Sequence, residues 1–162
     1  EAQFLATKIP HVEIVPTTDL DSNFKNIHPN GKRVVGQRLA DLALTQVYGE
    51  KTPAWQGPLF ATWEAKNGAA VVHFSNTGGK LSTRDGKAPD DFEIAGADGV
   101  FAPATATIDG DSVVLRSAKV ADPAAVRLGW FETAQPNLVN ADGLPAYPFR
   151  TNGPDWTPVK TK

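Results

Sequence analysis

The sequence contains neither cysteine nor methionine among its 162 residues. The lack of cysteine excludes disulfide bonds, thiolate zinc sites and cysteine nucleophiles, although it does not identify a compartment. An initiator methionine is normally removed only when the second residue is small, and this chain begins at Glu1. We therefore expect the chain to be part of a longer polypeptide, either released by proteolysis at Glu1 or cut out of a longer sequence.

Long apolar runs and charge of one sign are also missing. No run approaches the ~20 apolar residues that a membrane-spanning helix requires, and no basic segment followed by an apolar stretch opens the chain. The net charge of -2 is spread over interspersed acidic and basic residues, whereas binding to a phosphate backbone needs a basic stripe. We expect neither a membrane nor a nucleic acid as a partner.

The first 50 residues have the pattern of a strand, a polar loop and a helix. The β-branched segment 12–15 predicts a strand, and a polar loop over 17–27 ends at His28. Proline is favoured in the first turn of a helix, and apolar residues at helical spacing follow, so we predict a helix over about 29–48. This order is typical of the last unit of an open α/β sheet, in which functional loops lie at the carboxyl ends of strands.

Beyond Glu50 the pattern changes to short alternating apolar runs separated by turn dipeptides, which predicts an antiparallel β-sandwich. Asn67-Gly68 and Asp109-Gly110 favour the positive φ angles of tight turns and predict two hairpins. From Gln135 onward, proline, asparagine and glycine predict an ordered but irregular tail. The expected strands are 59–64, 69–74, 92–94, 100–108, 112–116 and 125–130.

These patterns predict a fold of the α/β plus all-β class in three parts. Residues 1–50 are the carboxy-terminal segment of an α/β domain, with its last strand, a polar loop that ends at His28 and a closing helix. Residues 51–134 form the β-sandwich domain. Residues 135–162 form a tail that packs on the α/β domain or on the sandwich.

The three histidines lack the spacing and the carboxylate context of a metal site, so we expect no metal and no cofactor. His73 lies in an alternating strand and is expected to be half-buried and structural, while His11 is expected in an exposed loop. His28 differs, because a ring between a strand-end loop and a helix start can face a nucleophile at the edge of a sheet. The alternative is that His28 caps the helix without any chemistry.

Several separated motifs occur in order along the chain, from about Glu1 to Arg150. They are Thr18-Asp19-Leu20-Asp21 and Asn26-Ile27-His28-Pro29 with Lys32, Gly36, Arg38 and Leu39; Phe92-Glu93-Ile94-Ala95-Gly96; Val126-Arg127-Leu128-Gly129-Trp130; and Asn137-Leu138-Val139-Asn140 with Gly143-Leu144-Pro145 and Pro148-Phe149-Arg150. The set resembles the carboxy-terminal part of sialate O-acetylesterases, which belong to the SGNH hydrolase superfamily.

The resemblance implies that a serine attacks an acetyl carbonyl while His28 takes its proton and later returns it to the leaving alcohol. An acidic side chain would orient the imidazole. The superfamily commonly places Asp three residues before this histidine, but Lys25 stands there. Asp19 is the first candidate for the orienting acid and Asp21 the second; the alternative for both is that they only form loop turns with nearby backbone amides.

The glycine-serine nucleophile motif of the superfamily and its oxyanion donors have no counterpart in this chain. All the serines lie in expected loops or strands without the strand-turn-helix setting that exposes a nucleophile; they are Ser22, Ser75, Ser82, Ser112 and Ser117. We therefore expect an upstream chain or segment to carry the nucleophile and the oxyanion hole, as in a processed two-chain esterase. The resemblance further implies a secreted or periplasmic protein whose substrate is an O-acetylated carbohydrate, either sialic acid or a plant polysaccharide.

A different class of function is a carbohydrate-binding β-sandwich module without catalysis. The residues that suit it are aromatic, because tryptophan rings stack on sugar faces, although aromatic residues beside strands more often serve a core. The candidates are Trp55, Trp63, Trp130 and Trp156. Arg150 is expected to pin the tail to the catalytic domain, with anchoring of a substrate as the alternative.

Overall fold

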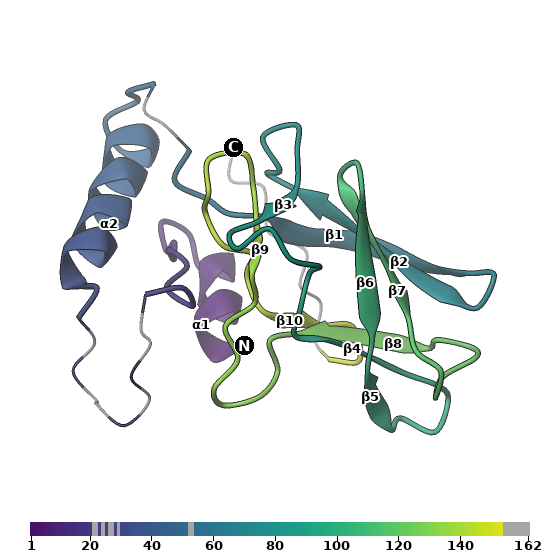
Figure 1. The fold of residues 1–162 in the computed structure, drawn as a ribbon. Helices are drawn as coiled ribbons and strands as arrows, with labels where there is room; N and C mark the ends of the chain where they lie inside the picture. The colour runs from purple at the N-terminus through teal and green to yellow at the C-terminus, as the bar shows by residue number, and fades with distance from the viewer. Residues whose placement is uncertain (21–22, 24, 26–27, 29, 52–53, 154–162) are drawn as a thin grey trace.

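The computed structural model describes residues 1–20, 23, 25, 28, 30–51 and 54–153. Two antiparallel four-stranded sheets form its main body (Figure 1), and a two-stranded sheet lies beside them. One large sheet has the order β1 (Leu59–Lys66), β2 (Ala69–Ser75), β7 (Ser112–Arg116) and β6 (Thr105–Asp109). The other has the order β10 (Phe149–Arg150), β8 (Ala125–Leu128), β4 (Phe92–Ala95) and β5 (Phe101–Pro103), and the small sheet pairs β3 (Ser82–Thr83) with β9 (Leu138–Val139).

The hydrophobic core lies between the two large sheets. Val72 and Leu115 face it from one sheet, Ile94 and Leu128 from the other, and all four are 0% exposed. Along β6 and β7 alternate residues point inward, which is the period-2 pattern that burial on one face requires. The expected β-sandwich is therefore confirmed, and every residue of its core cluster lies within 70–149.

The two expected hairpins are present. Asn67 and Gly68 have φ angles of 51° and 70° and join β1 to β2, which is the turn that the right-handed twist of strands prefers. Gly110 has a φ of 59° and begins the two-residue turn between β6 and β7. In both turns the dipeptide supplies the positive φ angle from which the hairpin was predicted.

The prediction of a single strand over 100–108 is wrong, because this stretch forms two strands that belong to different sheets. β5 belongs to one large sheet and β6 to the other. Between them Ala104 donates its backbone N–H to the carbonyl oxygen of Phe92 at 3.0 Å, so the chain crosses from one sheet to the other without a loop. Both strands turn their apolar side chains to the same core, and the alternation in the sequence therefore continues across the crossing.

The tail to Arg150 is packed on the sandwich and completes it. β9 pairs with β3, and β10 pairs with β8, so both elements add strands that the sequence pattern did not predict. Leu138, Ala146 and Phe149 enter the hydrophobic core. Each of these strands has two residues, which is too short for any periodic pattern to be visible.

The first 50 residues contain helices but no strand among those described. The elements are α1 (Ala2–Leu5), the 3-10 helix η1 (Ala6–Lys8) and α2 (Lys32–Gln46). The strand expected over 12–15 is wrong, because a strand needs a hydrogen-bonded neighbour and the described part of this chain offers none there. The helix expected over 29–48 is confirmed with shorter bounds. None of the described helices is long and apolar enough to span a bilayer.

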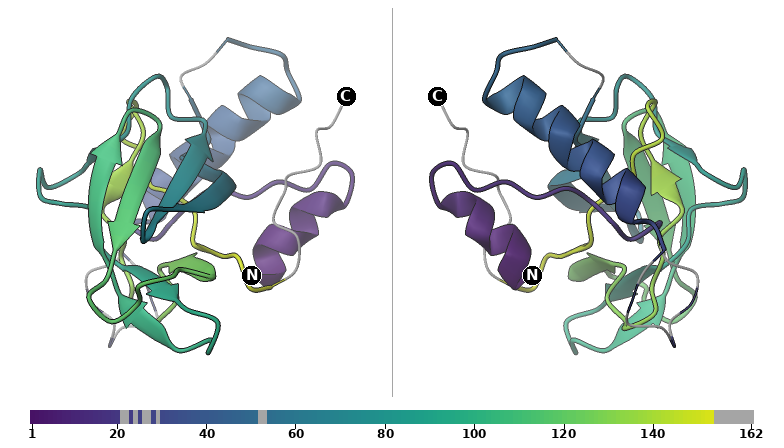
Figure 2. Two further views of the ribbon diagram at one scale, coloured as in Figure 1. Left: turned by 90° about the vertical axis from the view of Figure 1, so that its right-hand side faces the viewer. Right: turned by 90° about the vertical axis from the view of Figure 1, so that its left-hand side faces the viewer.

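The amino-terminal segment is attached to the tail of the sandwich. The Phe4 and Tyr147 rings pack edge to face with centroids 6.0 Å apart, and Tyr147 Oη donates to the carbonyl oxygen of Ile14 at 3.0 Å. Arg150 pairs with the Glu1 carboxylate at 2.7 Å, so the first residue lies beside β10 (Figure 2). Helix α2 stands to one side of the sandwich (Figure 1).

Candidate functional site

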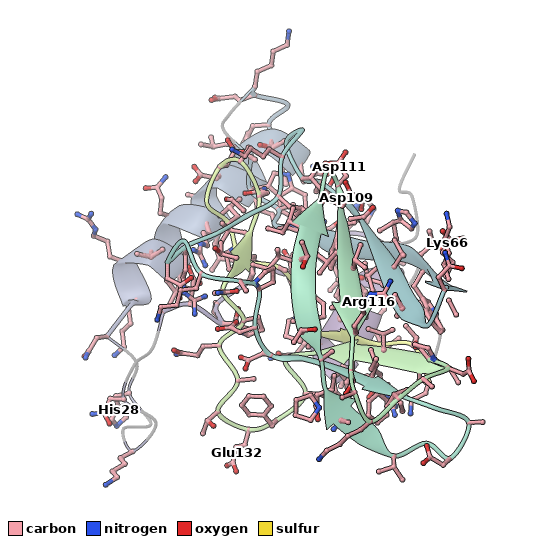
Figure 3. The ribbon with its side chains drawn as sticks, turned by 45° about the vertical axis from the view of Figure 1, so that its right-hand side comes forward. His28, Lys66, Asp109, Asp111, Arg116 and Glu132 are labelled. Carbon is pink, nitrogen blue, oxygen red and sulfur yellow. The ribbon has the colours of Figure 1, made fainter. Side chains whose placement is uncertain are left out.

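His28 lies on the segment that connects Leu20 to helix α2. Its side chain is exposed, and in the view of Figure 3 it lies below α2, away from the strands of the sandwich. The two ends of this segment meet, because a Cβ atom placed on Gly31 would be 2.8 Å from Leu20 Cβ and 3.0 Å from the Leu20 oxygen. The exposed histidine is therefore carried by a loop whose ends are in contact.

Asp19, at the start of this loop, forms an ion pair with Arg38 of helix α2. Arg38 donates from Nη1 to Oδ1 at 2.8 Å and from Nη2 to Oδ2 at 2.7 Å. Arg38 Nη1 also donates to the carbonyl oxygen of Pro16 at 2.6 Å. The side chains are only 9% and 15% exposed, so this bidentate pair is largely removed from water.

The structure brings Asp19 to Arg38, a pairing that the sequence analysis did not anticipate. Both residues lie in the motif that resembles the histidine block, but nothing in their spacing reveals the contact. The pairing of Asp19 with His28 stays a prediction. Asp21, the second candidate acid, lies outside the described residues.

The neighbouring segment 13–16 is held between α2 and the sandwich. Arg38 binds it at Pro16, and Tyr147 binds it at Ile14. Tyr147 is 4% exposed; this burial, reinforced by the charge of Glu13, raises the pKa of Tyr147 well above its usual range. The phenol therefore stays protonated as the donor to Ile14 at physiological pH.

A second histidine meets a serine elsewhere in the molecule. His73 of β2 and Ser112 of β7 are directly paired across the sheet, and Ser112 Oγ lies 2.7 Å from His73 Nδ1. Ser112 opens β7 directly after the β6–β7 turn, but a strand and not a helix follows it, so it lacks the strand-turn-helix setting that presents a nucleophile to a substrate. His73 is half-buried, as the sequence indicated, and this contact serves the pairing of two strands.

Of the aromatic and cationic candidates, Trp63, Trp130 and Arg150 have structural contacts. Trp63 packs against the hydrophobic core, and the Arg150 guanidinium lies 5.3 Å from the centre of the Trp130 ring. Because Arg150 also binds Glu1, it joins the tail to the amino-terminal segment. Trp156 lies outside the described residues.

A cleft of ≈ 680 Å³ opens at one end of the sandwich, between the β4–β5 and β7–β8 connections. Its lining includes the charged side chains of Asp98, Lys119 and Asp122 and the exposed Val100. The Phe92–Gly96 motif of the sequence reaches this lining with its last residue, Gly96. Among the residues that the structure describes, no group of three or more histidine or acidic side chains is arranged to hold a metal ion.

Comparison with known proteins shows a similarity to a solved structure. No family model matches the sequence, and no curated protein matches it. The chain is similar to a solved crystal structure, that of XAC1771, a carbohydrate acetylesterase from Xanthomonas citri, with 48% sequence identity and a TM-score of 0.77. The match covers 83% of this chain but 31% of the other, so this chain spans about a third of the length of the solved esterase.

Proposed function

We propose that this chain is the histidine-bearing, carboxy-terminal part of an esterase that removes O-acetyl groups from carbohydrates. The observation that carries the proposal is the 48% identity to a carbohydrate acetylesterase over 83% of the chain. The motifs around His28 support the finer assignment to the sialate O-acetylesterase type of SGNH hydrolase.

In the proposed reaction, His28 acts as general base and then general acid. It takes the proton of a serine hydroxyl as the serine attacks the acetyl carbonyl, and it gives a proton to the sugar oxygen as the alcohol leaves. Water then hydrolyses the acetyl-enzyme with the same histidine as base, which releases acetate. A positioned base of this kind contributes ~10²–10⁴-fold to the rate.

The serine and the oxyanion hole belong, in this proposal, to an upstream chain or segment. Three observations support this division. The chain spans 31% of the solved esterase, and none of the described residues among the first 50 belongs to the hydrophobic core cluster. Helix α2 also leaves Val34 and Leu39 39% and 48% exposed, as expected for a helix that packs on another domain.

The substrate and the acid that orients His28 follow from the same proposal. The substrate is an O-acetylated sugar, either sialic acid or a plant polysaccharide, and the protein acts outside the cell or in a periplasm. Asp19 remains the predicted orienting acid and Asp21 the alternative. The contact of Asp19 with Arg38 offers it a second role, in which it acts on the His28 loop rather than on the imidazole.

The test is His28→Ala in the complete esterase, with acetate release from O-acetylated sialic acid and from acetylated plant polysaccharide as the measurement. We expect kcat to fall by at least about 10²-fold because the proton acceptor is lost. The matched control is His11→Asn, since His11 is exposed with a φ of 65° that asparagine tolerates. Hydrolysis near the parent rate in His28→Ala would contradict the proposal, and the preferred substrate identifies the sugar.

A further inference from the structure

Helix α2 buries only one of its residues, and that residue is charged. Arg38 is 8% exposed and is the one buried residue of the helix, while Leu39, next to it, is 48% exposed. A helix that packs on its own chain normally turns an apolar stripe inward. The most deeply buried side chain of α2 is therefore a polar group, and it binds the preceding segment.

The contacts of Arg38 define a clamp across the base of the His28 loop. Its guanidinium binds the carboxylate of Asp19 through two parallel hydrogen bonds and the backbone of Pro16 through a third. Asp19 stands just before the loop, and Arg38 lies in the second turn of the helix that follows the loop. This bidentate arrangement fixes the relative orientation of the two groups as well as their distance.

A close contact between Gly31 and Leu20 joins the same two chain segments as the ion pair, the one before the His28 loop and the one after it. Gly31 precedes α2, and its position leaves no room for a Cβ atom against Leu20. The two chain ends that flank residues 21–30 are thus held by the Gly31–Leu20 contact and, about two turns further along α2, by the Arg38–Asp19 pair. The hydrogen bond from Tyr147 to Ile14 also joins the segment before the loop to the sandwich.

A largely buried ion pair is weak evidence for stability, because desolvation of the two charges offsets much of their attraction. Its clear physical effect is geometric. Proton transfer from a serine requires the imidazole within hydrogen-bond reach, and a misplacement of 1 Å can cost about 10²-fold in rate. A loop that carries a catalytic histidine therefore gains from ends that are fixed.

We propose that the Arg38–Asp19 clamp, together with the Gly31–Leu20 contact, positions His28 for catalysis, so that Asp19 and Arg38 act as positioning residues through the loop. This inference rests on the proposed function. It assigns Asp19 a role that needs no direct contact with His28.

The test compares Arg38→Gln, Asp19→Asn and the double variant in the complete esterase. We expect kcat to fall by about tenfold to 10²-fold in each, with KM changed less than about twofold, because the loop and not sugar binding is affected. The double variant should be no worse than either single variant, since both remove the same contact. Arg38→Lys should recover little, because an ammonium group cannot form the bidentate contact.

Arg33→Gln is the matched control, because it removes the same charge from an exposed position of the same helix. It should keep the parent kcat. Additive losses, or an Asp19→Asn loss far larger than that of Arg38→Gln, would overturn the clamp and indicate that Asp19 acts directly on His28. If Arg38→Gln keeps the parent kcat while His28→Ala is inactive, the clamp is overturned and the proposed function is not.

Gly31→Ala provides a second test that leaves the ion pair in place, for use if the charge variants fail to fold. The added methyl group would press on Leu20 and should lower kcat by about tenfold or more while KM stays near the parent value. Parent kcat in folded Gly31→Ala protein would contradict the role of the closed loop base.

Discussion

The first 50 residues and the sandwich differ in the interactions that hold each of them in place. The sandwich has a continuous core in which residues of both sheets are fully buried. The first segment is held by single polar and aromatic contacts, such as Arg38 with Asp19 and Tyr147 with Ile14, while its helix leaves apolar side chains exposed. The sandwich is therefore held together by a shared apolar core, and the described part of the first segment by individual contacts.

The largest expected effect comes from comparing one leucine in each region. Leu128→Ala removes a side chain that is 0% exposed in the core and should lower the free energy of unfolding by about 2–5 kcal/mol. Leu39→Ala, at 48% exposure on α2, should change it by less than about 0.5 kcal/mol in the isolated chain. Urea unfolding of both variants measures this; equal losses would mean that α2 shares the stability of the sandwich.

An intermediate effect is expected from the buried asparagine of the tail. Asn140 is 2% exposed; its Nδ2 donates to the carbonyl oxygens of Gln56 and Asn76, and its Oδ1 accepts from the N–H groups of Asp142 and Leu144. Asn140→Ala leaves these backbone groups without their partner and should lower the free energy of unfolding by about 1–3 kcal/mol.

The control for Asn140 is Gln37→Ala, which removes an exposed amide that donates to Asp41 at 2.9 Å. It should change the free energy of unfolding by less than about 0.5 kcal/mol. A cost for Asn140→Ala that is no larger than the cost for Gln37→Ala, measured by urea unfolding, would show that the tail adds little to the sandwich.

The smallest effect depends on pH and concerns Asp91, which has a φ of 59° and accepts a hydrogen bond from the Gln135 N–H at 2.9 Å. Burial raises the pKa of Asp91, so its ionisation destabilises the folded state once the pH rises through that pKa. Asp91→Asn keeps an acceptor for Gln135, removes the charge and suits the positive φ angle.

We expect Asp91→Asn to stabilise the sandwich at neutral pH by up to about 0.5 kcal/mol. The gain should shrink in acid, where the parent carboxyl group is protonated as well. Thermal unfolding at neutral and acidic pH measures the difference, and a gain that grows on acidification would contradict this account.

The sandwich and its hairpins were predictable because their signals are local. Alternating burial and the Asn67-Gly68 and Asp109-Gly110 turns stand in the sequence itself. β9 and β10 were missed because two residues show no period, and the expected strand over 12–15 failed because pairing depends on a neighbour that a local pattern does not reveal.

The candidate site was predictable only as far as residue types allow. His28 stood out by its place between a polar loop and a helix, and the resemblance gave it a role. The partner of Asp19 was not predictable, because Arg38 is 19 residues away and its burial depends on how helix and loop meet in space. A charged residue in an otherwise poorly buried helix is a signal that appears only once burial is known.

The crossing at Ala104 has an evolutionary consequence. Ala102 and Ala106 face the core from different sheets on either side of it, and side chains alternate along a strand with a period of two. An insertion of one residue there would turn one strand inside out, whereas the exposed turn at 97–100 tolerates changes in length. Homologous proteins should therefore vary in length at such turns and keep the Phe101–Asp109 run uninterrupted.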